Sequence, residues 1–225
     1  MGIQERKERE KGQRRDEILT AAQEVFFEKG LLNATMDEIA EKAELSKGTL
    51  YLYYRSKEDL YLAVMMRGMD TLYTLFARAV ANHHKAIDAL HGLAQAYIQF
   101  FEEHRSLFRM LHFFQTPQLH KQVSEEMLSA CSMQNMKLWN FVQELITRGI
   151  KEGDIRRDLN PISTAIVLWS ATTAIMARID YGSDYWKSTM KVDLELVLRQ
   201  SLDFLLDAIM TPQAREQLTK RPAIS

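Results

Sequence analysis

Apolar residues recur every three or four positions along most of this chain, which is the spacing of one face of an α-helix. Only 4 prolines and 9 glycines interrupt the 225 residues, so long helices can form. No stretch alternates apolar and polar side chains for long enough to predict a β-strand. The sequence therefore predicts an all-α fold.

The first predicted helix covers residues 14–29, where Ile18 and Ala22 begin a buried face and Gly30 marks the end. The preceding residues 1–13 alternate lysine or arginine with glutamate and contain no apolar core. They are therefore not a signal peptide, and we expect them to form a disordered arm, with contact to the minor groove of DNA as the alternative.

Two short helices are predicted next, each opened by a capping residue. Thr35 and Glu38 form a capping box, in which each side chain accepts a hydrogen bond from the other residue's backbone N–H. Ser46 opens a second helix over residues 47–54, and Ser56 opens the longer helix that follows. Two short helices joined by a tight turn, after a longer helix, are typical of a helix-turn-helix.

The segment 46–57 combines inward apolar positions with outward polar ones. On a helix, Leu50 and Tyr54 lie one turn apart and are expected to pack inward. The residues left outside are Lys47, Gly48, Thr49, Tyr51, Leu52 and Tyr53. Hydroxyl and ammonium groups donate hydrogen bonds to DNA phosphates, although a surface helix with incidental tyrosines would show the same pattern.

The net charge of −1 at pH 7 identifies no partner by itself. Basic and acidic residues are equal in number up to Lys57, whereas the segment 46–57 contains Lys47, Arg55 and Lys57 and no acidic residue. Any nucleic-acid surface must therefore be a local patch, because a strongly basic domain is absent from the sequence.

Several motifs stand together between residues 15 and 60. They are the stretch 18–26, Gly30, Thr35, the pair Ile39 and Ala40, the run Ser46-x-Gly-Thr-Leu-Tyr, the pair Tyr53 and Tyr54, and the run Ser56-Lys57-Glu58-x-Leu60. This combination resembles the DNA-binding region of the TetR family of bacterial transcription regulators. The resemblance implies a regulator whose second short helix enters the major groove of double-stranded operator DNA.

The resemblance also implies roles for individual residues. Phosphate contacts would come from Thr35, Tyr51, Tyr53 and Lys57. The first residues of the reading helix, Ser46, Lys47, Gly48 and Thr49, would lie at base edges or the nearby DNA backbone, with Leu52 able to contact a thymine methyl group.

One position departs from the family pattern. Glu44 stands in the turn between the two short helices, where the family usually has glycine. If the turn requires a positive φ at this position, a residue other than glycine costs about 1 kcal/mol there. Such replacements are tolerated, so the helix-turn-helix prediction stands.

From residue 58 onward the predicted helices are longer and rich in methionine and aromatic residues. Core packing explains any one of these residues, whereas together they are typical of an adaptable apolar pocket. The residues expected to line it are Met65, Met69, Phe76, Phe101, Phe108, Met110, Phe114, Met127, Trp139, Trp169, Thr173 and Met176. The predicted organisation is an arm over 1–13, a three-helix DNA-binding domain over 14–57, and a larger helical ligand-binding and dimerisation domain over 58–225.

By the same resemblance, the helices over 161–181 and 192–209 would form a four-helix interface in a homodimer. Dimerisation sets the separation of the two reading helices, which must match one turn of DNA, about 34–36 Å. A small, largely apolar ligand that favours misaligned reading helices would release the DNA. The sequence therefore predicts a repressor freed from a palindromic operator by such a ligand, while the opposite preference would make the ligand a co-repressor.

Catalytic or metal-binding motifs are scarce in the sequence. The 6 histidines include a His84/His91 pair two helical turns apart, and neither an HExxH spacing nor a glycine-rich phosphate loop occurs. The single cysteine, Cys131, cannot build a cysteine metal site and suits a reducing cytoplasm. We expect no cofactor, no metal and no membrane span. The alternative is a helical ligand-binding or enzymatic protein that has lost operator binding.

Overall fold

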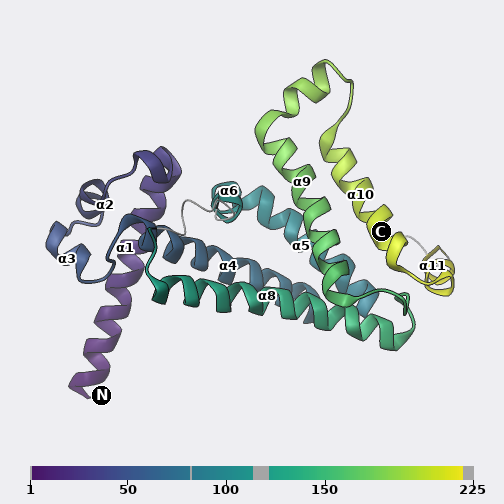
Figure 1. Cartoon of the computed structure of the whole chain (residues 1–225), viewed down its shortest axis with the longest axis horizontal. Coiled ribbons are helices and arrows are strands. Elements are labelled where there is room, and N and C mark those ends of the chain that lie inside the picture. The colour runs from purple at the N-terminus through teal and green to yellow at the C-terminus, as the bar shows by residue number, and fades with distance from the viewer. Residues whose placement is uncertain (1, 82, 114–121, 220–225) are drawn as a thin grey trace. The chain divides into compact units, whose positions relative to one another are not determined.

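The computed structural model describes residues 2–81, 83–113 and 122–219, and its helices are shown in Figure 1. The chain divides into two compact units, described separately below. Unit 1 consists of residues 1–71 and 106–135, and unit 2 consists of residues 72–105 and 136–225. The all-α prediction is confirmed.

The helices fall into the two units as follows. Unit 1 contains α1 (Ile3–Asn33), α2 (Met36–Lys42), α3 (Lys47–Tyr51) and most of α6 (Arg105–Phe113). Unit 2 contains α5 (Ala86–Glu103), α9 (Pro161–Ser188), α10 (Leu194–Ile209) and α11 (Pro212–Thr219). Two further helices, α4 (Lys57–Ala81) and α8 (Glu125–Glu152), contribute residues to both units.

The predicted domain boundary between residues 57 and 58 differs from this division. The first turns of α4 belong to unit 1, where Leu60 and Leu62 are fully buried and Tyr61 packs edge-on against Phe26 of α1, with 5.1 Å between ring centroids. Buried residues of a helix belong to the unit whose core they pack into. The first turns of α4 therefore extend the DNA-binding unit beyond residue 57.

The helix α1 begins at Ile3 and therefore includes residues 3–13, the segment expected to form a disordered arm. Glutamate, arginine, lysine and glutamine are strong helix formers. Arg6 and Glu10 form an ion pair of 2.8 Å at the i,i+4 spacing, and Glu5 accepts a hydrogen bond from the Gly2 backbone N–H at 2.9 Å. Local pairing, and not burial, therefore favours the helix over a disordered arm.

The core of unit 1 joins α1, α2, α3 and the start of α4. Ile18 and Ala22 of α1, Ile39 of α2 and Leu50 of α3 are all fully buried. Tyr54 is also buried, as the helical spacing predicted. This shared core fixes α3 against α2, and the opposite side of α3 remains exposed.

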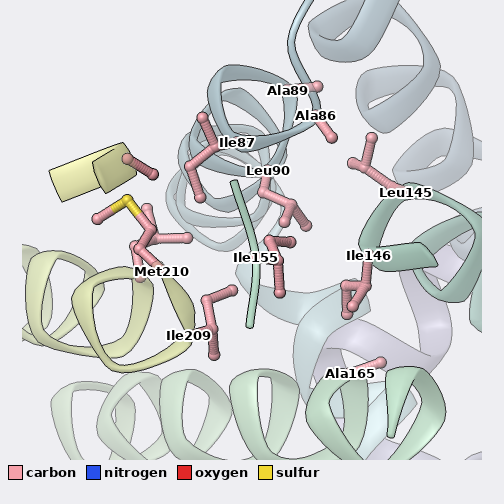
Figure 2. Packing of buried hydrophobic residues seen from close by; sticks show 12 residues of the cluster. Ala86, Ile87, Ala89, Leu90, Leu145, Ile146, Ile155, Ala165, Ile209 and Met210 are labelled. Carbon is pink, nitrogen blue, oxygen red and sulfur yellow. The ribbon is translucent and has the colours of Figure 1, made fainter. Parts of the chain in front are cut away.

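The core of unit 2 gathers buried residues from α5, α8, α9, α10, α11 and the segment after α8 (Figure 2). Ile155 lies at its centre, and its segment pairs with Met210 through an isolated β-bridge. Gly149 of α8 is required here, because an added Cβ would stand 2.5 Å from Cδ1 of Ile155. The helix then ends before Gly153, whose φ of 84° is left-handed.

Most predicted helix ends agree with the structure to within a few residues. The predicted helices over 161–181 and 192–209 begin within two residues of α9 and α10, and Asn160 caps α9 by accepting a hydrogen bond from the Ser163 backbone N–H at 3.0 Å. In contrast, α9 continues past residue 181 to Ser188 across a non-helical Gly182. The reading helix α3 is shorter than predicted, ending at Tyr51 instead of residue 54.

Within the described residues, α9 is the one helix long and apolar enough to cross a membrane by length and composition alone. Only 33% of its most apolar stretch is buried in the single chain. Its exposed apolar side chains include Ile166, Val167, Tyr181 and Tyr185. These side chains form a surface that one copy of the chain leaves uncovered.

Candidate nucleic-acid interface

The entry to α2 is held by the capping box that the sequence predicted. The Thr35 hydroxyl accepts a hydrogen bond from the Glu38 N–H at 3.3 Å, and the Glu38 carboxylate accepts one from the Thr35 N–H at 3.1 Å. Lys29 donates to the same carboxylate at 2.7 Å, and this hydrogen bond lowers the pKa of Glu38. These bonds fix the α1–α2 connection, which presents Thr35 at the surface.

The turn between α2 and α3 depends on Glu44. This residue has a φ of 55°, so the turn does require the left-handed conformation that glycine adopts most easily. Hydrogen bonds from the Glu44 N–H to the Glu41 carbonyl, at 3.0 Å, and from the Leu45 N–H to the Ala40 carbonyl, at 2.9 Å, close the turn. The turn therefore forms without glycine, at a cost of about 1 kcal/mol.

The reading helix α3 begins at the predicted cap. Ser46 accepts a hydrogen bond from the Thr49 N–H at 3.1 Å, and the two hydroxyl oxygens lie 2.8 Å apart. On the outer side Tyr51 is 45% exposed and Leu52 is 84% exposed. An added Cβ on Gly48 would meet only the Ser46 hydroxyl, at 3.9 Å, so this part of α3 leaves space for the backbone of another molecule.

Lys47 does not stand free on this surface. Its ammonium lies 2.7 Å from a carboxylate oxygen of Asp37 in α2, and this hydrogen bond raises the pKa of Lys47. Sequence reasoning missed the role of Asp37, because the two residues stand ten positions apart and only the fold brings them together. A DNA contact by Lys47 must compete with this ion pair.

Lys57 lies beside the α1–α2 connection. Its ammonium donates hydrogen bonds to the carbonyl oxygens of Leu32 at 3.2 Å and Ala34 at 3.1 Å. Lys57 is therefore held next to Thr35, the other residue predicted to contact phosphate from this side. An ammonium has three donors, so these two bonds leave one for a phosphate.

The structure thus collects the predicted DNA-binding residues on unit 1, over α2, α3 and the adjoining turns (Figure 1). Gly48, Tyr51 and Leu52 are exposed, whereas Thr49, Tyr53 and Lys57 are half-buried. Residues 18–64 match the bacterial regulatory proteins of the tetR family. The chain belongs to the TetR family.

Relatives of this TetR-family chain are transcription regulators. It is 36% identical over 99 residues to the transcriptional activator FasR of Mycolicibacterium smegmatis, a match that covers 44% of this chain and 45% of FasR. It is 27% identical over 147 residues to the repressor KstR2 of Mycobacterium tuberculosis, covering 65% of this chain and 72% of KstR2. It is 28% identical over 173 residues to the regulator UidR of Escherichia coli K12, covering 74% and 81%.

Solved structures share the fold over nearly the whole chain. That of KstR2 of Mycobacterium tuberculosis, a ketosteroid transcriptional regulator, has a TM-score of 0.64 at 23% identity and covers 88% of this chain and 95% of that one. FadR of Bacillus subtilis in complex with stearoyl-CoA has a TM-score of 0.67 at 19% identity, covering 86% and 98%. These structures show the fold, while the family match and the named relatives show a DNA-binding transcription regulator.

The predicted pocket residues of this TetR-family regulator divide between its two units. Unit 1 holds the buried Met65, Met69, Phe108 and Met110 and the half-buried Met127. Unit 2 holds the buried Phe76, Phe101, Thr173 and Met176 and the half-buried Trp139 and Trp169. Phe114 lies outside the described residues. That all these residues line one pocket stays a prediction.

Unit 2 of the regulator contains an aromatic cluster around Tyr97, a residue that sequence reasoning missed. Tyr97 stacks on Trp169 with ring centroids 4.3 Å apart, and Trp139 meets Trp169 edge-on at 5.9 Å. The Tyr97 and Thr173 hydroxyl oxygens lie 2.8 Å apart, and burial strongly raises the pKa of Tyr97. The cluster thus sets a neutral phenol and a hydroxyl, both buried, among aromatic rings.

Proposed function

We propose that this TetR-family regulator is a repressor that binds a palindromic operator as a homodimer and is released by a small, largely apolar ligand. The observation that carries the DNA part is the two-sided character of α3. Leu50 is fully buried on one side, while Leu52 and Tyr51 are exposed on the other. An exposed leucine and tyrosine on a short, rigidly capped helix are poorly explained by folding and well explained by contact with DNA.

The proposed contacts follow from the donors on this surface. Tyr51 and Tyr53 offer phenol O–H donors, and Thr35 and Lys57 hold a hydroxyl and an ammonium beside the α1–α2 connection. The other predicted contacts are at the start of α3, where Ser46 caps the helix and Lys47, Gly48 and Thr49 meet base edges or DNA backbone. Leu52 would contact a thymine methyl group.

Dimerisation is proposed from α9 and α10, which pack along each other in unit 2 and expose apolar side chains. Ile166 and Val167 of α9 are 47% and 59% exposed, and Leu196 and Phe204 of α10 are 54% and 72% exposed. Residues of this size seldom form an uncovered surface in a soluble monomer. A second copy of the same two helices would cover them and give the four-helix interface that the family resemblance implies.

The ligand is proposed from the aromatic cluster of unit 2 and from the relatives. FadR of Bacillus subtilis was solved with stearoyl-CoA, and KstR2 is described as a ketosteroid regulator. Both ligand types have a large apolar part, which suits Trp139, Trp169 and Met176. FasR is named an activator and KstR2 a repressor, so the sign of regulation needs its own measurement. Such a regulator acts in the cytoplasm, where its DNA lies.

The test begins with selection of duplex DNA from a random library by the full chain. A palindromic consensus is expected, with an affinity that falls steeply as salt rises, because phosphate contacts release counterions. Tyr51→Ala and Lys57→Ala should both weaken DNA binding. Arg157→Ala, which changes a residue of unit 2, should leave DNA binding unchanged. Absence of an enriched sequence, with binding indifferent to both substitutions, would favour a helical ligand-binding protein that has lost its operator.

The ligand part is tested separately on the selected operator. Stearoyl-CoA and a steroid are added as probes, and the fraction of DNA bound is followed by fluorescence anisotropy. Release of DNA supports the proposed repressor, since ligand and DNA must weaken each other equally by linkage. Tighter DNA binding with either probe would instead make that probe a co-repressor.

A further inference from the structure

The first half of α1 has a basic face. Four basic residues stand at spacings of four, three and one positions, which places them on one side of a helix with about 3.6 residues per turn. Each stands eleven residues before a buried residue of the same helix, and eleven residues make about three full turns. The pairs are Lys7 with Ile18, Lys11 with Ala22, Arg14 with Val25, and Arg15 with Phe26. The side of α1 that is apolar and buried after residue 17 is therefore basic and exposed before it.

The acidic residues in the first half of α1 do not share the centre of the basic face. Glu5 and Asp16 lie on the other side of the helix, whereas Glu8, Glu10 and Glu17 lie along the borders of the basic face. Arg6 pairs with Glu10 at 2.8 Å and Arg14 with Glu17 at 2.7 Å. Among the described residues, no ion pair includes Lys7 or Lys11. The first half of α1 thus has a positive side, although its acidic and basic residues are nearly equal in number.

This basic face adjoins the predicted phosphate contacts. The reading helix α3 shares its core with α1, since Leu50 of α3 and Ile18 of α1 are both fully buried in unit 1. Arg15 stands about one turn before Ile18, so the basic face begins where α1 leaves the core that it shares with α3. From Arg15 back to Lys7 the helix runs outward, and its first turns extend beyond α2 and α3 (Figure 1). All described side chains from Gln4 to Glu17 are exposed.

We propose that this basic face, Lys7, Lys11, Arg14 and Arg15, binds the phosphate backbone of the operator outside the base pairs that α3 reads. The inference rests on the proposed function. The face is about 12 Å long at 1.5 Å per residue, and each DNA strand has one phosphate per about 3.4 Å of the helix axis, so a face lying along the axis has about three phosphates of one strand within its reach. Lysine and arginine contact phosphates without reading sequence. The face adds affinity and lengthens the bound DNA segment, and it leaves the consensus unchanged.

The experiment compares two double variants of the full chain on the selected operator with long flanks. The Lys7→Gln and Lys11→Gln pair removes the basic face, and the matched Arg6→Gln and Arg9→Gln pair removes the same charge from the other side. Arg6 and Arg9 stand eleven residues before the exposed Glu17 and Thr20. Glutamine is a strong helix former, so both variants should keep the circular dichroism of the original chain.

The lysine pair is expected to lower the slope of log affinity against log salt by roughly 2 per protomer, since each phosphate contact contributes about 0.9. Its affinity at low salt should fall at least tenfold, and the arginine pair should change it less than threefold. In the unchanged protein, trimming the DNA flanks should reproduce the loss seen in the lysine pair.

Two results would overturn the inference. Equal losses in both pairs would show a general charge effect, and an unchanged slope in the lysine pair, together with indifference to flank length, would show that the face does not contact DNA. In either case Tyr51→Ala should still weaken binding, which leaves the proposed function intact. If the unchanged chain selects no DNA at all, the proposed function and this inference fail together.

Discussion

The ammonium of Lys47, at the start of α3, lies 2.7 Å from the carboxylate of Asp37 in α2. Both side chains are more than half exposed, so the ion pair contributes little to the stability of the fold. It does place a negative charge on the side of the helix-turn-helix proposed to meet DNA. The carboxylate repels phosphates and occupies the ammonium that is proposed to contact them.

Asp37→Asn should therefore strengthen operator binding. We expect a gain of several-fold at low salt that shrinks as salt rises, because exposed charges are screened. Anisotropy titrations at two salt concentrations measure it, with thermal unfolding expected to change little. Glu41→Gln removes the same charge from the same helix and is the control. A gain of equal size in the control would mean that net charge, and not the Lys47 pair, sets the affinity.

Thr35 has two proposed roles, capping α2 and contacting a phosphate, which substitutions can separate. Thr35→Ala removes the cap and should lower the free energy of unfolding by about 1 kcal/mol. Thr35→Asp keeps a capping oxygen, so its stability should stay near that of the original chain while its charge repels phosphate and weakens binding at least tenfold. Urea unfolding and anisotropy measure the two effects. Normal operator binding by the aspartate variant would remove Thr35 from the interface.

Glu44 holds a φ of 55° in the turn before the reading helix. Glu44→Gly should relieve this strain and raise the free energy of unfolding by up to about 1 kcal/mol, less the added flexibility of the unfolded chain. Glu41→Gly, within α2, should instead lower it by about 1 kcal/mol, because glycine weakens a helix interior. Urea unfolding of both variants tests this, and a loss of stability in Glu44→Gly would contradict the strain argument.

Phe204 is 72% exposed on α10 and belongs to the proposed dimer surface. Phe204→Glu should leave the fold of each chain intact, because the side chain is not part of its core, and should prevent association by burying a charge in the apolar interface. Light scattering is expected to give a monomer, with loss of tight operator binding. Met133→Glu changes a residue of α8 that is 65% exposed and should remain dimeric. A dimeric Phe204→Glu would place the interface elsewhere.

Tyr97 and Thr173 share a buried hydrogen bond of 2.8 Å in unit 2. Tyr97→Phe leaves the Thr173 hydroxyl without this partner and should cost about 1–3 kcal/mol. Thr173→Val in the same chain removes the second polar group and should recover part of the loss. A double-mutant cycle by urea unfolding measures the coupling. Additive losses would show that the two hydroxyl groups act independently.

Much of the interface could be predicted because its determinants are local. The capping residues Thr35, Ser46 and Asn160 bond to backbone N–H groups three positions away, so a short motif specifies each one. The burial of Leu50 and Tyr54 follows from helical spacing alone. For the same reason, the motifs between residues 15 and 60 carried the family resemblance without any knowledge of the packing.

Other features depend on contacts that no local pattern encodes. Lys57 reaches carbonyl groups 23 and 25 positions earlier, and Lys47 meets an aspartate ten positions earlier, because α1, α2 and α4 share a core. Residues 3–13 form a helix because of which charged residues pair, as Arg6 does with Glu10, and not because of how many charged residues the segment contains. The sequence by itself determined the helical class, the caps and the reading helix, since these depend on neighbours a turn or so away. Only the tertiary structure decided which charges meet, which apolar residues share a unit and which faces remain exposed, because burial depends on how helices distant in sequence pack together.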